Sequence, residues 1–178
     1  HFPALELALP ALRGLSQADA DALRAKVLSL ARTDARISLS EFALISYLER
    51  HLTVGAGKAR PSLHHSYKTV EPALKALLWL VARSGARQPE EASERYQIAI
   101  AGFPVDNQPP AAEALTPDQL LEHLQSLSRL TTLLKPAVLD ACGDCILADG
   151  QVNAREYELV RILADYLDCP LPPLPALQ

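Results

Sequence analysis

Apolar positions recur along this chain at the three- and four-residue spacing of amphipathic helices, and the alternating pattern of strands is nearly absent. Leu23, Val27 and Leu30 show the helical spacing clearly. The pattern predicts an all-α fold, a helical bundle of about seven helices. The expected ranges are 16–32, 38–52, 72–84, 89–101, 116–130, 135–148 and 153–167, with a short helix near 3–13 that Pro10 interrupts.

Two capping signals place helix starts. Ser38 is followed three positions later by Glu41, and Thr116 is followed three positions later by Gln119. In such a capping box the first side chain accepts a hydrogen bond from a free N–H, and the second reaches back to the first residue's own N–H. Both pairs therefore predict that a helix begins at their first residue.

Prolines and glycines mark the boundaries between helices. Pro72 suits the first turn of a helix, and Gly85 suits its end. The range 55–68 is predicted as a polar loop, and 103–115, which holds three prolines, as a linker or surface loop. The tail 170–175 cannot be helical and favours polyproline II geometry.

One pattern occurs twice, in 34–44 and in 149–159, and can be written D-x-x-[IV]-[SN]-x-x-E-[FY]-x-L. Each copy lies between two apolar helical patterns. We therefore expect two pseudo-repeated helix–turn–helix hairpins, 16–52 and 135–167, within a single all-helical domain that spans 1–178.

Every position of the repeat has a structural role. Ser38 and Asn153 are expected to cap helices, with Glu41 and Glu156 completing the capping boxes. Gly150 allows a positive φ in the second turn. One hairpin cannot bury its broad apolar face alone, so the two should share a core. The residues expected to meet there are Leu23, Val27, Leu30, Ile37, Phe42 and Leu44 with Val138, Cys142, Cys145, Val152, Tyr157 and Leu159.

The acidic turns also raise the alternative of a metal-sensing domain. A metal bound by the turns would take its ligands from Asp34, Glu41, Asp149 and Glu156. An EF-hand, however, places oxygen ligands at alternate positions and a bidentate Glu at the twelfth, whereas here the Glu is the eighth residue counted from the Asp. We therefore expect no metal site in this chain.

Cys142 and Cys145 form a C-x-x-C pair, which raises the further alternative of a thiol-based enzyme. Thioredoxin-like redox motifs lie in a βα context that this helical chain lacks, and a zinc site would need more ligands than Cys169 can add. In the repeat the pair aligns with Val27 and Leu30, so we expect both thiols in the core. An odd number of cysteines favours a reducing compartment.

The charge balance and the missing motifs exclude several functions. The net charge is −4, with 17 basic and 21 acidic residues interspersed, which argues against nucleic-acid binding. No apolar run reaches the length of a membrane helix, and Ala73–Ala82 reads as a buried helix. The five histidines include no H-E-x-x-H, and no catalytic residue or cofactor site is indicated. Because the chain has no Met, we expect it to be part of a longer protein.

The second copy of the repeat resembles a known family. Ala148-Asp-Gly-Gln-Val-Asn-Ala-Arg-Glu-Tyr-Glu-Leu-Val-Arg161 is similar to the A-D-G-x-[VI]-x-x-x-E-x-x-L-[LV]-R motif of TerB-like helical domains. With the ending Leu167–Pro173 and the opening Pro3–Arg13, the chain resembles the soluble C-terminal region of bacterial integral-membrane zinc metallopeptidases of the HtpX and CAAX-protease kind. The first copy departs from the motif, since Ala35 stands in place of the glycine.

The resemblance implies a non-catalytic regulatory or protein-interaction domain that is appended to a membrane zinc metallopeptidase. The catalytic zinc would then lie in the parent peptidase segment, and this chain would contain no catalytic residue. Its partner would be another protein or the parent peptidase segment. The resemblance places the chain on the cytoplasmic face of the inner membrane.

Overall fold

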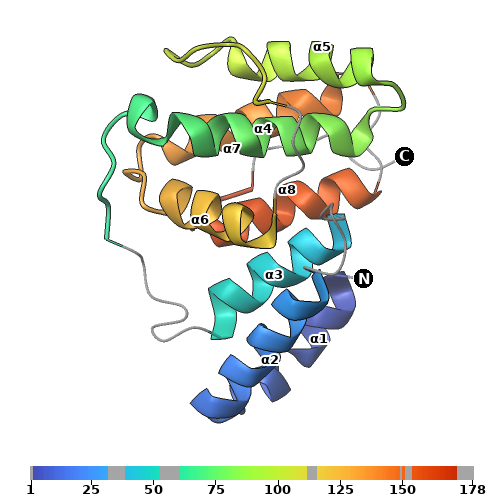
Figure 1. Cartoon of the computed structure of the whole chain (residues 1–178), viewed down its shortest axis with the longest axis vertical. Helices are drawn as coiled ribbons and strands as arrows, with labels where there is room; N and C mark the ends of the chain where they lie inside the picture. The colour runs from blue at the N-terminus through green and yellow to red at the C-terminus, as the bar shows by residue number, and fades with distance from the viewer. Residues whose placement is uncertain are drawn as a thin grey trace. The chain divides into compact units, whose positions relative to one another are not determined.

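The computed structural model of the chain describes residues 2–31, 39–52, 61–111, 116–148, 150 and 154–171 (Figure 1). Over these ranges it is all-α, as predicted, with eight α-helices and one short 3₁₀ helix. The elements are α1 (Phe2–Arg13), α2 (Gln17–Ala31), α3 (Leu39–Leu52), η1 (Tyr67–Val70), α4 (Glu71–Gly85), α5 (Pro89–Ile100), α6 (Pro117–Ser128), α7 (Lys135–Leu147) and α8 (Ala154–Tyr166).

The described ranges hold eight α-helices, so the count of about seven is not confirmed, although each of the seven expected ranges and the short one near 3–13 overlaps an observed helix. One detail of the predicted pattern is wrong, because helix α1 continues through Pro10 instead of being interrupted there. Proline removes one N–H from a helix, and the helix accommodates Pro10 at an exposed position.

A capping box begins α6, and a side-chain cap begins α2. The Gln119 backbone N–H donates to Thr116 Oγ1 at 3.2 Å, and the Thr116 N–H donates to Gln119 Oε1 at 2.9 Å, as the sequence predicts. At α2 the Asp19 N–H donates to Ser16 Oγ at 3.2 Å. The predicted caps Ser38 and Asn153 lie outside the described residues.

Helix α8 ends in a Schellman motif. The Cys169 N–H donates to the Ala164 carbonyl at 3.0 Å, and the Asp168 N–H donates to the Asp165 carbonyl at 3.2 Å. The residue between the helix and Cys169 must take a left-handed conformation, and Asp168 does so with φ of 54°. Glycine is the usual residue at this position, so Asp168 carries a backbone strain that glycine would not.

The chain forms two compact units. Unit 1 comprises His1–Ala59 and Ala114–Leu121, and unit 2 comprises Arg60–Glu113 and Glu122–Gln178. The first predicted hairpin, 16–52, belongs to unit 1, and the second, 135–167, belongs to unit 2. A single domain with a core shared by both hairpins therefore stays a prediction.

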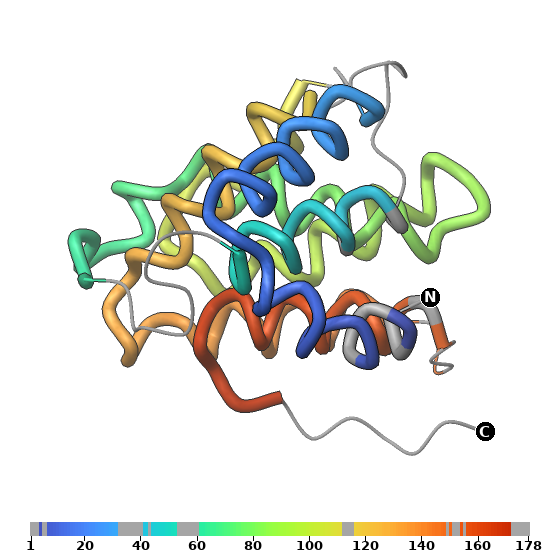
Figure 2. Tube along the Cα trace, turned by 90° about the horizontal axis from the view of Figure 1, so that it is seen from below, coloured from blue at the N-terminus to red at the C-terminus, as the bar shows by residue number. Residues whose placement is uncertain are grey.

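Unit 1 is built around α3. Both α1 and α2 pack against this helix, and Figure 2 shows α2 and α3 side by side. A small core joins the three helices through Ala20, Leu48, Leu52, Leu12, Leu23, Val27 and Leu44. The core assignment of Leu30 is wrong, because 65% of its surface is exposed. Ala31, the next residue and the last of α2, is 1% exposed, so the buried side at this end of the helix includes Ala31 and not Leu30.

Unit 2 has the larger core. Helices α4, α5 and α7 pack pairwise against one another, and α8 packs against α4 and α7 (Figure 1). The prediction that Ala73–Ala82 is a buried helix is confirmed, since most of these side chains are buried in α4. The largest fully buried side chains of the unit are Tyr96, Tyr166, Leu74, Leu77, Leu78, Ile100, Leu124, Leu127, Leu130 and Leu139.

The proline-rich segment after α5 is fastened to unit 2. Lys75 Nζ of α4 forms an ion pair with Asp106 at 2.7 Å, and the hydroxyl of Tyr96 donates to the Gln108 carbonyl at 3.1 Å. Phe103 is buried at the start of the segment. Burial, with Asp106 and Glu71 nearby, raises the pKa of Tyr96 to about 12, so its hydroxyl stays a donor over the physiological range. Part of the segment predicted as a linker thus packs on α4 and α5.

No helix in the described ranges combines the length and the apolar character needed to cross a lipid bilayer.

Candidate functional site

The four acidic residues of the repeat have different positions. Asp34 and Asp149 lie outside the described residues. Glu41 is half-buried in the first turn of α3, in unit 1. Glu156 lies in the first turn of α8, in unit 2, and its side chain is 3% exposed. Because so few of its atoms reach water, Glu156 needs a compensating partner inside the fold.

That partner is Arg95 of α5. Its Nη1 donates to Glu156 Oε1 at 3.3 Å, and its Nη2 donates to Glu91 Oε1 at 2.7 Å. The Arg95 side chain is 2% exposed, whereas that of Glu91, one helical turn earlier, is 33% exposed. The guanidinium therefore joins a buried carboxylate of α8 to a carboxylate at the surface of α5. We call Glu91, Arg95 and Glu156 the buried charge cluster.

Gly85, the last residue of α4, makes room for this cluster. A Cβ at position 85 would lie 2.5 Å from Arg95 Nη1 and would also collide with Glu156 Oε1. From the sequence, Gly85 is expected only to end a helix. In the structure α4 does end there, but the position also needs a residue without a side chain.

The chemistry of the cluster is structural. Both carboxylates accept hydrogen bonds from the one guanidinium, which links α5 to α8. Breaking a buried pair leaves an uncompensated charge in the core, so each partner holds the other in place. Glu156 therefore serves to join α8 to α5, a role that the capping box did not predict.

Arg95 is not among the site residues predicted from the sequence, although the sequence contains a signal for its burial. The buried face of α5 consists of Ala92, Arg95, Tyr96, Ala99 and Ile100. An arginine in the middle of an apolar stripe requires a buried carboxylate, because charged side chains are almost never fully buried unless they are paired. The sequence could not indicate which carboxylate this would be.

The thiols of Cys142 and Cys145 are buried in α7, as predicted. Burial is the main cause that raises the pKa of Cys142, and it raises the pKa of Cys145 to about 12. The guanidinium of Arg95 acts in the opposite direction on Cys145 without reversing the shift. Reactive cysteines are accessible and have a lowered pKa, so both thiols have the character of structural residues.

Potential metal ligands do not converge within the described residues. No group of three or more His, Cys, Asp and Glu side chains in these ranges is placed to hold a metal ion. The two candidate ligands in the described ranges, Glu41 and Glu156, belong to different units. A site that also used Asp34 and Asp149 lies outside the described residues and stays untested.

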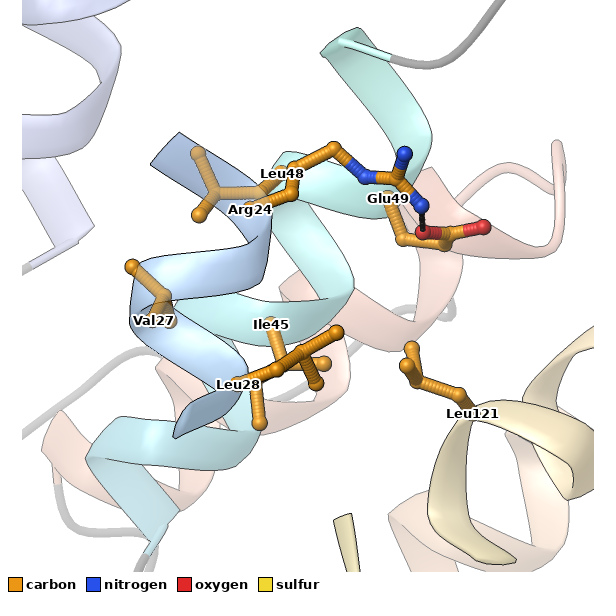
Figure 3. A pocket seen from close by; sticks show the side chains of 7 residues that line it. All are labelled: Arg24, Val27, Leu28, Ile45, Leu48, Glu49 and Leu121. Atoms are coloured by element: carbon orange, nitrogen blue, oxygen red, sulfur yellow. Dashed lines mark hydrogen bonds and ion pairs between the residues drawn. The ribbon is translucent and has the colours of Figure 1, made fainter. Parts of the chain in front are cut away.

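Unit 1 carries a shallow hollow between α2, α3 and the first turns of α6 (Figure 3). Arg24 and Glu49 form an ion pair at its rim, and Arg24 also pairs with Asp21 at 3.3 Å. The floor is apolar and is lined by Val27, Leu28, Ile45, Leu48 and Leu121. The space in it that water-sized molecules can occupy is only about 10 Å³, far below the roughly 300–1,000 Å³ of small-molecule sites, and the side chains of Arg24 and Glu49 are paired with each other.

Comparison with protein-family models, with curated proteins and with solved structures found no match to this chain.

Proposed function

We propose that this chain is a non-catalytic regulatory or protein-interaction domain appended to a membrane zinc metallopeptidase. The proposal starts from the resemblance of Ala148–Arg161 to the TerB-like motif and of both chain ends to the C-terminal regions of such peptidases. Under this proposal the zinc ion belongs to the parent peptidase segment.

One observation carries the proposal. Glu156, the glutamate of the TerB-like motif, is buried and paired with Arg95, and so acts as a structural residue. Gly150, the glycine of the same motif, has the positive φ of 73° that the tight turn requires. Both motif residues therefore stabilise the fold, and we infer that the domain acts through its surface.

The buried cysteines support the same reading against a thiol-based enzyme. A nucleophilic or redox cysteine needs access and a stabilised thiolate, and Cys142 and Cys145 have neither. The metal-sensing alternative gains no support from the described residues, whose carboxylates and thiols do not converge.

The first test reads the coding sequence around this chain for an H-E-x-x-H segment and membrane spans. The second measures cleavage of a model substrate by the parent protein, intact and with residues 1–178 deleted. We expect zinc-dependent cleavage by both proteins, with an altered rate or substrate preference after the deletion. A coding sequence without a peptidase segment, or loss of the catalytic zinc on deletion, would contradict the proposal.

A matched variant separates regulation from folding. Ile98→Ser changes a side chain of α5 that is 55% exposed and should leave the fold intact. Arg95→Met disrupts the buried charge cluster and should unfold unit 2. If the domain regulates the peptidase through its folded surface, Arg95→Met should reproduce the deletion.

A further inference from the structure

One edge of unit 2 is formed by two segments that are distant in sequence. The backbone N–H groups of Leu63 and His64 donate to the Arg129 carbonyl at 2.8 and 3.1 Å, and the Thr131 N–H donates to the His64 carbonyl at 2.9 Å. The Tyr67 hydroxyl adds a bond to the Leu134 carbonyl at 2.9 Å. These bonds hold 61–70 against 129–134, the segment that links α6 to α7 (Figure 1).

This edge exposes two large apolar side chains. Leu133, in the turn that precedes α7, is 91% exposed, and Leu63 is 56% exposed. Leu63 is itself bonded to the Arg129 carbonyl, and Leu133 directly precedes Leu134, whose carbonyl accepts from Tyr67. The two leucines therefore belong to the same edge. The turn itself is fixed by a bond from the Leu134 N–H to the Thr131 carbonyl at 3.0 Å. Leu133 therefore projects from an ordered turn.

The same edge is cationic, although the chain as a whole has a net charge of −4. Lys68 and Arg129 are both exposed, and neither forms an ion pair within the described residues. The sequence has no Asp or Glu from Arg60 to Val70, nor from His123 to Leu139. Of the carboxylates that border these stretches, Glu71 pairs with Lys75 at 3.9 Å, and Glu122 and Asp140 lie on the helices beyond. We call Leu63, Lys68, Arg129 and Leu133 the cationic edge.

We propose that the cationic edge binds the surface of an anionic lipid bilayer, with Leu133 and Leu63 entering the interface and Lys68 and Arg129 contacting the headgroups. Burial of apolar side chains in the interface and attraction of cations to anionic headgroups both add to membrane binding of peripheral proteins, and this edge offers both. The site is independent of the proposed function, because it rests on the exposure and charge of this edge alone.

The shape of the edge favours a bilayer over an acidic peptide. A peptide needs a groove that covers its side chains, whereas Leu133 projects almost fully into solvent. A bilayer accepts such a side chain without a preformed pocket. The absence of Asp and Glu within 60–70 and 123–139 also suits a broad layer of negative charge, which interacts with all cations at its surface rather than with one partner each.

The test measures co-sedimentation of the full chain with vesicles of phosphatidylcholine, alone or with about 30% phosphatidylserine, at low salt. We expect binding to the anionic vesicles and little to the neutral ones. Leu133→Ser should weaken binding about tenfold, as expected when one leucine no longer enters the interface. Lys68→Gln and Arg129→Gln should each weaken it about fivefold, and about 0.5 M salt should remove most of it.

Matched controls carry the same chemistry elsewhere in unit 2. Ile98→Ser removes an apolar side chain that is 55% exposed on α5, and Arg83→Gln removes an exposed cation of α4. Neither should change vesicle binding. Circular dichroism of every variant should match that of the original chain, since all these positions are exposed.

Three outcomes would overturn the proposal. One is no binding to anionic vesicles at low salt. Another is equal loss of binding in the Ile98→Ser and Arg83→Gln controls, which would indicate nonspecific adsorption. The third is binding of a fluorescein-labelled peptide of alternating Glu and Leu, sensitive to Leu133→Ser, without vesicle binding. That result would make the edge a peptide site.

Discussion

The guanidinium of Arg95 meets the carboxylate of Glu156 at 3.3 Å, across 61 positions of sequence, and joins α5 to α8 inside unit 2. Gly85 of α4 lies against both groups. Three helices therefore converge on one buried ion pair. Because neither group can reach water easily, the stability of unit 2 depends on keeping the pair complete.

Arg95→Met should destabilise the chain strongly. The variant keeps most of the side-chain volume but removes the guanidinium that pairs with buried Glu156, and breaking a buried ion pair typically costs about 3–5 kcal/mol. Urea unfolding followed by circular dichroism gives the free energy of unfolding. Glu91→Gln is the matched control: its side chain is 33% exposed, and the expected loss is at most about 1 kcal/mol.

The double variant Arg95→Met/Glu156→Met distinguishes an unpaired charge from lost packing. If the charge is the cause, removing both partners should recover part of the loss, because no ion is then left buried. A double variant less stable than Arg95→Met alone would show that packing around the two side chains dominates.

Gly85→Ala should also destabilise unit 2, while Gly102→Ala should not. The added methyl at position 85 would collide with the Arg95–Glu156 pair, and displacing packed groups in a core typically costs about 1–3 kcal/mol. At position 102 the new Cβ has no neighbour within 4 Å. Equal urea midpoints for both alanine variants would contradict the close approach of α4 to the pair.

Cys142 and Cys145 should react slowly with thiol reagents in the folded chain and rapidly after unfolding. With a pKa of about 12, the Cys145 thiol is ionised to only about one part in ten thousand at pH 8. Cys169 is less buried and should react first. Ellman's reagent with and without urea measures the rates, and fast labelling of folded Cys145 would refute its burial.

The raised pKa of Cys145 also sets a pH dependence. Below its ordinary value of 9.0 the thiol is protonated in both states, so its contribution to stability is constant. Between about pH 9 and about pH 12 the unfolded chain loses the proton while the folded chain retains it, so the free energy of unfolding should fall as pH rises. Cys145→Ala should make this fall shallower, which urea titrations across that range would detect.

Removing a helix cap should lower the free energy of unfolding. Ser16→Ala and Thr116→Ala remove side-chain acceptors seen at helix starts, and each should cost about 0.5–2 kcal/mol. Ser38→Ala and Asn153→Ala should cost similar amounts if the repeat is a capping device. Urea midpoints that shift for Ser16 and Thr116 but not for Ser38 and Asn153 would reject that interpretation of the repeat.

Asp168→Gly should stabilise the chain by about 0.5–1 kcal/mol, because glycine takes the left-handed conformation at the end of α8 without strain. Asp165→Gly is the control within the last turn of the same helix. There glycine should destabilise by a similar amount, since it loses more conformational freedom on folding. Thermal unfolding of the two variants should therefore shift in opposite directions.

Sequence patterns identified the helices well, because caps and prolines act locally. Thr116 and Gln119 cap α6 as expected, and Pro72 and Pro89 lie in the first turns of α4 and α5. Apolar periodicity was less reliable for burial. It failed for Leu30, which is exposed while its neighbour Ala31 is buried, because apolar spacing alone does not fix which side of a helix faces its neighbours.

The buried charge cluster could be foreseen only in part. An arginine on the apolar stripe of α5 indicates that a buried partner exists, but the choice of Glu156 depends on how α5 and α8 pack. The role of Gly85 depends on the same packing. Long-range pairing of this kind follows from tertiary structure, which one sequence without related sequences does not encode in any local signal.

The division of α6 between the two units has a consequence for cleaved chains. Residues 116–121 belong to unit 1, although they follow the first stretch of unit 2, Arg60–Glu113, in sequence. A single cut within 53–60 would therefore separate α1–α3 from a segment that completes their unit. We expect the fragments 1–59 and 60–178 to reassociate when mixed, and this chain could then serve as a split protein whose halves report on proximity.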